Sequence, residues 1–595
     1  MNPEPTLRKR NIALGIVVLT IVVFIAYFSA LSLSFVGDDW IFFELAGRLN
    51  LEEYLVKYFD PRVQTAWYRP VQGVLFRVGY DVFGTNQVGY HLVNVLIHLG
   101  NSVLLFLLVG RALKRWFVAF LAGLLFATFP IAVEGVFKAG VIDPVTALFF
   151  LIAIWFWLGY LAKGSSRDYW LAFGAFLIAL LSKEIAITLP VTLFLFDRFA
   201  VPNKTSIKQL AQRYMWFVLA WIAYLPLEYL VVSRSVFVHR EGYQPSLRLF
   251  SNLIDYLAGL TFPWGFIPPL SYVWLAVVAA ILTYLILFRK VYAFIPIVVG
   301  AILAVLPIVL FPEVSFRFDY VSLTASAFFF ALLLDWVARK LPAALPFRRA
   351  VILAGVVIIA AIGSAQVTKA TADFGEFARV SRVTFRNIRQ QHPTLPQDTL
   401  VYVVDPPLPG PNLSGMLFWY YGPGVTGLAN DSARMAGLRE HAAAYVYYFD
   451  GDGNQKEIRV EKEMRPRANP APPFNFSAPI RLEGFELANS TVKRGESIVL
   501  FLYWRGLGRM ETDYVTSVQL LDARNTAVAT YAKPPRRGNA PTSAWTPGEL
   551  IVDVVPLAVP AQTPIGPFRL EVGLYDAGTK QSAGMISIEP VDISE

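Results

Sequence analysis

Two adjacent carboxylates, Asp38 and Asp39, directly follow the first long apolar segment of the chain, in the string Val36-Gly37-Asp38-Asp39-Trp40. A membrane helix needs no acidic pair at its end. A carboxylate beside the membrane can, however, accept a proton from a hydroxyl group that acts as a nucleophile. The pair is therefore a candidate general base, with solvated interfacial charge as the alternative.

More ionisable residues lie close to membrane depth, and most of them fall on the same side of the predicted membrane as the acidic pair. Charged groups at that depth are costly and usually face a cavity or a pathway, so this collection predicts a shared polar chamber. Arginine holds phosphate through two parallel bonds and lysine holds it as a point charge. Carboxylates and cations together beside lipid fit chemistry on a lipid-linked phosphate. The residues are His91, Glu134, Lys138, Asp143, Lys183, Glu184, Arg234, Glu313, Arg317 and Asp319.

The loop after the acidic pair is long, from Asp38 to about Gln87, and it adds Arg69 to these charges. Its amphipathic stretch Leu45–Tyr58 predicts a segment that lies along the membrane and forms the floor of the chamber. His98 lies about two helical turns deeper than His91 and is predicted to be a hydrogen-bonded core residue. For any single member of the set, an interfacial anchor or a structural ion pair is the alternative.

Eleven apolar segments are candidates to cross the bilayer, which takes roughly 20 residues of helix. The first follows Arg8-Lys9-Arg10 and exceeds the apolar core of a signal peptide, about 7–15 residues. The fifth and sixth flank Lys183-Glu184, with one broken helix as the alternative. Phe250–Pro269 is rich in Pro and Gly and is predicted to be interfacial or re-entrant. The eleven are Asn11–Gly37, Val88–Gly110, Phe117–Val133, Pro144–Ala162, Tyr169–Ser182, Ile185–Phe196, Tyr214–Ser233, Ser271–Phe288, Val291–Pro312, Tyr320–Leu334 and Ala350–Val367.

Basic residues cluster in every second loop when the N-terminus is placed in the cytoplasm, as the positive-inside rule requires. This bias accounts for the net charge of +9 without nucleic acid as a partner. It also places everything after Val367 outside the cytoplasm. The chain has no cysteine, which excludes a disulfide framework, a thiolate zinc site and a cysteine nucleophile.

The water-facing third contains two regions. Residues 368–464 mix a predicted amphipathic helix, Phe374–Gln391, with a short strand, Thr399–Val404. After a linker rich in Pro and Asn, evenly spaced strand-like runs in residues 480–595 predict a β-sandwich, with a structural role or a sugar- or partner-binding role. The runs are Ser497–Trp504, Tyr514–Leu521, Val528–Ala532, Leu550–Leu557 and Phe568–Tyr575. The predicted fold class is a multi-span α-helical membrane domain, residues 1–367, followed by a mixed α/β region and a β-sandwich.

The chain resembles the GT-C class of polytopic glycosyltransferases, in which an acidic pair follows the first helix. It is most similar to bacterial relatives of the protein O-mannosyltransferases and of the transmembrane-and-tetratricopeptide mannosyltransferases. The resemblance covers about residues 10–340, although the chain has Val141 where relatives tend to have Arg, and it shows no 34-residue repeat. The matching strings are FVGDDW (35–40), WYRPVQGVLF (67–76), GYHLVNVLIHLGNSVLLFLL (89–108), AVEGVFKAGVID (132–143), LLSKEIAITLP (180–190) and RFDYVSL (317–323).

The resemblance implies an inverting transfer of a sugar from a polyprenyl-phosphate donor to a hydroxyl of a protein, lipid or glycan, at the outer face of a bacterial cytoplasmic membrane. Asp38 would be the base, with Asp39 as its helper. The donor phosphate would be held by Arg317, Lys183 and Arg69. The remaining cavity residues would be Glu184, Glu134, Asp143, Tyr320 and His91. We expect no obligatory cofactor, although Asp38 and Asp39 could supply oxygen ligands to a divalent metal.

Two other functions fit the same topology. A flippase for lipid-linked oligosaccharides would need a polar pathway open to both faces, whereas the charges at membrane depth lie mostly on the outer side. A non-catalytic membrane subunit that holds partners through its outer domains would tolerate the loss of the acidic pair.

Overall fold

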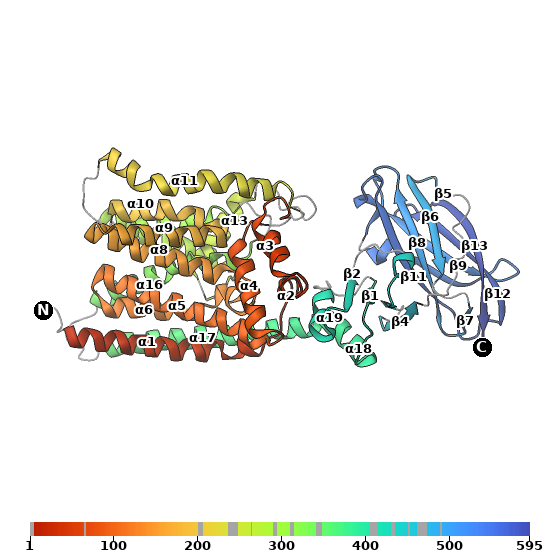
Figure 1. The fold of residues 1–595 in the computed structure, drawn as a ribbon, viewed down its shortest axis with the longest axis horizontal. Coiled ribbons are helices and arrows are strands. Elements are labelled where there is room, and N and C mark those ends of the chain that lie inside the picture. The colour runs from red at the N-terminus through yellow and green to blue at the C-terminus, as the bar shows by residue number, and fades with distance from the viewer. Residues whose placement is uncertain are drawn as a thin grey trace. The chain divides into compact units, whose positions relative to one another are not determined.

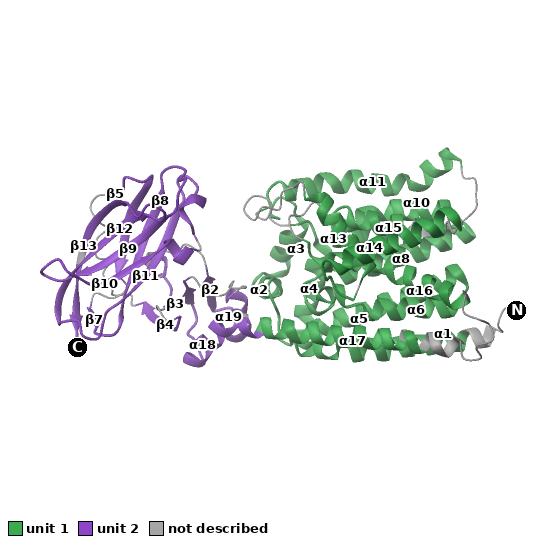
Figure 2. Cartoon of the chain, turned by 180° about the vertical axis from the view of Figure 1, so that it is seen from behind, with its two compact units in different colours: residues 1–378 green, residues 379–595 purple. Residues whose placement is uncertain are grey.

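The computed structural model divides the chain into two compact units, residues 1–378 and residues 379–595 (Figure 2). The first unit is helical, and the second unit holds all the strands that the structure describes. The described residues are 5–64, 67–199, 206–235, 248–262, 264–289, 294–309, 314–340, 348–404, 413–429, 435–438, 440–449, 453–460, 473–487, 491–538 and 540–595.

The first unit is a bundle of apolar helices that lie side by side along one direction (Figure 1). A backbone in lipid must satisfy its own N–H and C=O groups, which favours helices. Among the described residues, five helices are long and apolar enough to cross a membrane, which confirms a multi-span membrane region. Each of the eleven predicted segments holds a helix, but how many of them cross stays a prediction. The helices are α1 (Pro5–Tyr27), α5 (Gln87–Leu113), α6 (Trp116–Thr128), α8 (Asp143–Lys163), α9 (Ser166–Ser182), α10 (Leu189–Phe199), α11 (Ile207–Val232), α14 (Leu270–Thr283), α15 (Phe294–Val305), α16 (Leu323–Lys340) and α17 (Arg348–Ser381).

The chain reverses direction at Lys183-Glu184, so α9 and α10 are two helices and the alternative of one broken helix is wrong. At the start of α9, the hydroxyl of Tyr169 donates to the carbonyl of Arg213, which lies near the start of α11. The guanidinium of Arg213 in turn bonds to Asp197, near the end of α10. The start of α9 and the end of α10 therefore lie at the same end of the bundle. A short 3₁₀ turn, η3 (Glu184–Thr188), makes the reversal.

The long segment between α1 and α5 folds into three short helices, α2 (Asp39–Arg48), α3 (Leu51–Phe59) and α4 (Pro70–Phe83). The predicted amphipathic stretch is thus two helices, because Asn50 begins α3 with a capping box that it forms with Glu53. Tyr54 and Tyr58 hold α3 against α4. The Tyr54 hydroxyl donates to the carbonyl of Gly73, and a Cβ at Gly73 would lie 2.3 Å from the ring of Tyr58.

The predicted interfacial segment Phe250–Pro269 begins with an amphipathic helix, α13 (Leu249–Thr261), and continues as a loop. This helix supports η5 (Phe316–Tyr320), the 3₁₀ turn that carries Arg317. Phe316 packs on Gly259, where a Cβ would lie 2.7 Å from its ring. The hydroxyl of Tyr256 accepts a bond from the backbone N–H of Ser315. Both contacts fix the turn just before Arg317.

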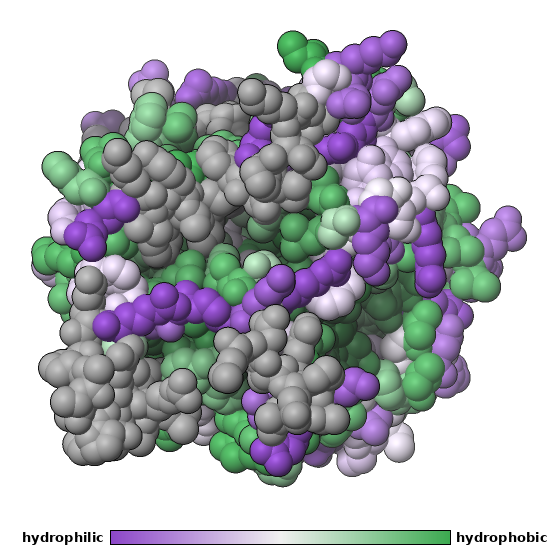
Figure 3. Space-filling model, turned by 90° about the vertical axis from the view of Figure 1, so that its left-hand side faces the viewer, coloured by the Kyte–Doolittle hydropathy of each residue, from purple (hydrophilic) through white to green (hydrophobic). Residues whose placement is uncertain are grey.

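At the end of the bundle where the N-terminus lies, hydrophilic side chains form a band between apolar ones (Figure 3). Arg115 and Arg339 both pair with Asp335 there. Arg111 reaches across to the carbonyl of Trp155. These basic groups lie where the positive-inside rule expects them, and the orientation of the bundle in a membrane stays a prediction.

The second unit opens with α18 (Val383–Gln391) and a four-stranded sheet of order β2-β1-β3-β4, in which β1 is parallel to β2 and to β3. The predicted helix Phe374–Gln391 is therefore the end of α17 followed by α18. A helix, α19 (Leu413–Tyr421), packs beside β2. The strands are β1 (Thr399–Val403), β2 (Val425–Ala429), β3 (Ala443–Phe449) and β4 (Gln455–Val460).

Residues 473–595 form two further sheets, of order β10-β9-β12-β13-β7 and β11-β8-β6-β5, which share one apolar core. All five predicted strands are present, in β8 to β12. Strand β8 carries a continuous buried run, residues 498–504, because both its faces are covered. Leu500 and Leu502 face that core, while Val499 and Phe501 pack against β1 and β3. The strands are β5 (Phe474–Asn475), β6 (Ile480–Leu487), β7 (Thr491–Lys493), β8 (Ser497–Gly506), β9 (Tyr514–Leu521), β10 (Ala527–Lys533), β11 (Leu550–Ala558), β12 (Gly566–Asp576) and β13 (Ser582–Ser594).

Candidate active site

A cavity of about 430 Å³ lies where the loop helices α2 and α3 meet the ends of the bundle helices farthest from the N-terminus. Its walls come from the start of α2, the end of α3, the segment before α4, the segment between α7 (Glu134–Phe137) and α8, the turn after α9, and η5. Segments far apart in the sequence thus bring six of the ten predicted site residues to one cavity. These are Asp38, Asp39, Arg69, Asp143, Lys183 and Arg317.

Asp39 is buried and held by backbone N–H groups. One carboxylate oxygen accepts from Gly140 at 2.6 Å, and the other accepts from Val36 at 3.1 Å and from Ala139 at 3.4 Å. Burial raises the pKa of Asp39 to about 6, although these N–H groups and the nearby Lys138 act in the opposite direction. The side chain therefore ties the start of α2 to the segment before α8.

Asp38, by contrast, is exposed to the cavity. It occupies the cap position before α2, but its carboxylate does not cap the helix. It makes no side-chain hydrogen bond or ion pair with any residue that the structure describes. Of the two adjacent acids, Asp38 is thus the one whose carboxylate is available to an incoming hydroxyl.

Two of the cavity cations are neutralised by carboxylates, one of them buried and the other partly buried. Lys183 bonds to Asp143 at 2.5 Å, with side-chain exposures of only 1% and 3%. Arg69 makes a bidentate pair with Glu184 through its Nε and Nη2 atoms. Each pair carries no net charge, so neither adds positive potential to the cavity.

Arg317 and Lys138 differ, because they share a single carboxylate. The same Oε1 atom of Glu134 accepts from Arg317 at 2.8 Å and from Lys138 at 2.5 Å. Burial pushes the pKa of Glu134 upward, but the charges of the two cations outweigh it and the pKa lies below its ordinary value. Taken by themselves, these three side chains carry one net positive charge.

The remaining predicted site residues lie behind the cavity wall or away from it. Glu134 and Glu184 contribute as the partners of lining cations. Tyr320 is buried in the bundle core, where its hydroxyl bonds to His98 at 2.6 Å and accepts from Asn101. His91 is also buried, beside the ring of Phe35. Tyr320 and His91 therefore do not line the cavity, and the prediction that His98 is a bonded core residue is confirmed.

Four lining residues were not singled out from the sequence, and a fifth, Lys138, was expected in the polar chamber but given no role. The four are Lys57, Gln64, Trp67 and Gln72. Lys57 belongs to the amphipathic stretch, and its side chain forms no ion pair with a described residue. Gln64 fixes that wall by donating to the carbonyl of Lys57. The available sequence signal was the polar face of α3 and the string around Trp67, but only the fold shows which of these side chains reach the cavity.

A metal would have few ligands here. Within the described parts of the chain, no group of three or more His, Asp or Glu side chains is placed to hold one. Both oxygens of Asp39 already accept backbone N–H groups, so the acidic pair offers mainly the oxygens of Asp38.

Gly140 is where the backbone comes closest to this acidic pair. A Cβ at Gly140 would lie 2.6 Å from the ring of Phe42 and 2.8 Å from Oδ1 of Asp39. We expect Gly140→Ala to displace Asp39 and to cost about 1–3 kcal/mol, as overpacking typically does. Gly174→Ala is the matched control, because a Cβ there meets no heavy atom within 4 Å. Unfolding of the two variants in detergent checks this; equal stability of both would show that the site relaxes freely.

Comparison with known proteins finds relatives of the segment that contributes Arg69, Lys138, Asp143 and Lys183 to this cavity. The family described as dolichyl-phosphate-mannose-protein mannosyltransferase matches residues 69–229. The human protein O-mannosyl-transferase TMTC2 is 35% identical over 154 residues, which are 24% of this chain and 18% of that protein. Human TMTC4 is 32% identical over 173 residues, covering 24% of this chain and 22% of that protein. Drosophila melanogaster Tmtc1 is 30% identical over 199 residues, covering 31% and 22%.

The matched segments make up about a fifth of the length of these relatives. Among solved structures, arabinosyltransferase EmbB from Mycobacterium smegmatis aligns with 97% of this chain and 64% of its own, at 11% identity and a TM-score of 0.29, which carries no argument about the fold. Through its helical first half, the chain resembles the protein O-mannosyltransferases and, with them, the GT-C class of polytopic membrane glycosyltransferases.

Proposed function

We propose that the protein is a glycosyltransferase that moves a sugar from a polyprenyl-phosphate carrier to a hydroxyl acceptor. The observation that carries this proposal is the pairing, in one cavity, of the unbonded carboxylate of Asp38 with the cationic wall of Arg317 and Lys138. The first group suits a proton acceptor and the second suits a leaving phosphate. The names of the relatives make mannose the first sugar to test.

In the proposed reaction, the acceptor oxygen attacks the anomeric carbon as its proton passes to Asp38. The bond from that carbon to the phosphate oxygen breaks, and the lipid phosphate leaves with both electrons. Arg317 and Lys138 stabilise the charge that develops on it. Attack from the face opposite the phosphate inverts the anomeric configuration through an oxocarbenium-like transition state.

This assignment changes the roles expected for two cations. Lys183 and Arg69 were expected to hold the phosphate, but each already pairs with its own carboxylate. A phosphate drawn toward either one would also be repelled by Asp143 or Glu184. We therefore assign Lys183 and Arg69 to the architecture of the wall, and the phosphate to Arg317 and Lys138.

The setting that we propose is a bacterial cytoplasmic membrane, with the N-terminus in the cytoplasm and the cavity on the outer face. Eleven spans would place the second unit, including a β-sandwich, on the outer side as well. Its two sheets share an apolar core and would serve as a module that presents or binds the acceptor.

Purified full-length protein in lipid nanodiscs tests the reaction. Incubation with polyprenyl-phosphate mannose and a serine- and threonine-rich peptide should release polyprenyl phosphate and give a mannosylated peptide. Movement of the intact lipid across a bilayer without cleavage would instead support a flippase.

Arg317→Gln should raise the KM for the donor about tenfold or more, because it removes a charge-assisted hydrogen bond worth about 1.5–3 kcal/mol. Arg62→Gln, in the segment between α3 and α4 and with a side chain 78% exposed, is the control and should leave the KM unchanged. An unaltered KM in Arg317→Gln would exclude this residue from the phosphate site.

A further inference from the structure

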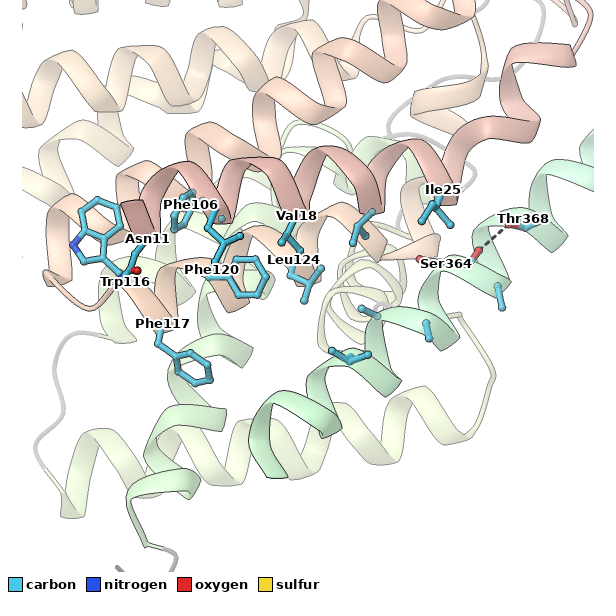
Figure 4. Close-up of a pocket in the computed structure, with 17 residues that line it drawn as sticks. Asn11, Val18, Ile25, Phe106, Trp116, Phe117, Phe120, Leu124, Ser364 and Thr368 are labelled. Carbon is cyan, nitrogen blue, oxygen red and sulfur yellow. Dashed lines mark hydrogen bonds between the residues drawn. The ribbon is translucent and has the colours of Figure 1, made fainter. Parts of the chain in front are cut away.

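A second and larger cavity lies between α1 and α17. It is an apolar groove of about 890 Å³. Figure 4 shows Val18 and Ile25 along α1 facing Ser364 and Thr368 on α17, with Leu124 of α6 between the two helices. The described fold does not fill this groove with a side chain of its own, and its lining would accept a hydrocarbon chain.

The length of the groove indicates what kind of chain it fits. Its lining runs along α1 from Asn11 to Ile25, which is about 21 Å at 1.5 Å of rise per residue. One leaflet of a bilayer provides about half of a hydrocarbon core roughly 30 Å thick. The groove therefore continues past the midplane, where the acyl chain of an ordinary phospholipid in the outer leaflet would end. A polyprenyl chain is long enough to follow it.

The outer end of the groove leads along α17 toward the candidate active site. Beyond Thr368, about 9 Å farther along the helix, the ring of Phe374 packs at a tilt against the ring of Phe137, with ring centres 4.3 Å apart. The ammonium of Lys138 lies 5.4 Å from the centre of the same Phe374 ring. Lys138 also lines the catalytic cavity. One stretch of α17 thus connects the apolar groove with the cationic wall.

A positively charged side chain, Lys369, lies near the mouth of the groove and would attract a lipid phosphate. Ala361 and Ala365 line the groove, and Lys369 continues their four-residue spacing by one more turn of the same helix face. Lys369 is exposed and has no ion-pair partner among the described residues. A phosphate-headed lipid entering the groove would meet this cation before it reaches Lys138.

We infer that the groove between α1 and α17 holds the polyprenyl chain of the carrier lipid while its phosphate contacts Arg317 and Lys138. The inference rests on the proposed function and adds a basis for selecting the carrier by its length. Val18 on α1 and Val357 and Ala361 on α17, which lie farther from its mouth than Ile25 and Thr368, are its length-selecting residues.

The test compares two isoprenoid phosphates, farnesyl phosphate and undecaprenyl phosphate, at equal mole fraction in nanodiscs that hold the full-length protein. The wild type should bind the long lipid about tenfold more tightly than the short one, a difference of about 1.4 kcal/mol. Ala361→Trp fills the groove and should abolish that preference while farnesyl phosphate still binds. Val357→Trp, at an exposed position farther from the mouth, should do the same if Ala361→Trp folds poorly.

Ile362→Trp is the matched control, because Ile362 is the next residue on α17, is 50% exposed and does not line the groove. It should keep the preference for the long lipid. Equal wild-type affinity for the two lipids, or a preference that survives both groove-filling variants, would overturn the groove assignment and leave the phosphate site standing. Farnesyl phosphate binding that Arg317→Gln does not weaken would instead contradict the proposed function.

Discussion

Asp38→Asn is expected to lower the turnover number by about 10²- to 10⁴-fold, which is the usual contribution of a general base. The amide has nearly the shape of the carboxylate but cannot take the proton of the acceptor hydroxyl. Asp38 is exposed and its side chain bonds to no described residue. The free energy of unfolding should therefore stay within about 0.5 kcal/mol of the wild type. Steady-state release of polyprenyl phosphate in nanodiscs, measured beside unfolding in detergent, checks both statements.

The neighbouring acid is the control for this prediction. Asp39→Asn replaces an oxygen that accepts from the backbone, so it should lower stability and turnover together. Asp38→Glu keeps a carboxylate and should retain more activity than Asp38→Asn. Turnover in Asp38→Asn within about threefold of the wild type would contradict the base assignment, since loss of a general base costs far more.

The sequence predicted elements well where the signal is local. Long uncharged runs predict membrane helices because the bilayer imposes their length, and every such run holds a helix. The alternating or continuous apolar runs of β8 to β12 were found in the same way. The sequence did not decide whether the chain reverses at Lys183-Glu184. Two short apolar runs around a charged pair look the same whether one helix bends there or two helices turn back on each other. Only the bonds between Tyr169, Arg213 and Asp197 distinguish the two.

The sequence predicted which residues gather at the candidate site better than it predicted what each of them does there. Side chains at one end of many spans must lie near one another, and six of the predicted residues do line one cavity. Which acid is free depends on backbone N–H groups from residues about a hundred positions away. Which cation is neutralised likewise depends on long-range partners. His91 was assigned to the cavity from its depth and Tyr320 from the resemblance, but the fold buries both side chains.

Breaking the buried pair of Lys183 and Asp143 is expected to have the largest effect on stability. Their side chains are 1% and 3% exposed, and they bond at 2.5 Å. Either Asp143→Asn or Lys183→Met leaves a buried charge without its partner, which costs about 3–5 kcal/mol. The double variant Asp143→Leu with Lys183→Met removes both charges and should recover most of that loss, since apolar replacement of a buried pair is often close to neutral. The free energy of unfolding of the wild type, the two single variants and the double variant is measured by titrating a denaturing detergent into mixed micelles.

Asp81→Asn provides the reference for an exposed pair. Asp81 lies one turn from Arg77 on α4 with a side chain 53% exposed, and such pairs are worth about 0.2–1 kcal/mol. If the single variants of the buried pair lower stability no more than Asp81→Asn does, the pair of Lys183 and Asp143 is solvated and does not stabilise the cavity wall.

The double variant also separates two roles for Lys183. If Lys183 only shapes the wall, restored stability should come with a near-normal KM for the donor. If Lys183 holds the phosphate, the KM should stay high even though the fold has recovered, because the positive charge that would bind the donor is gone.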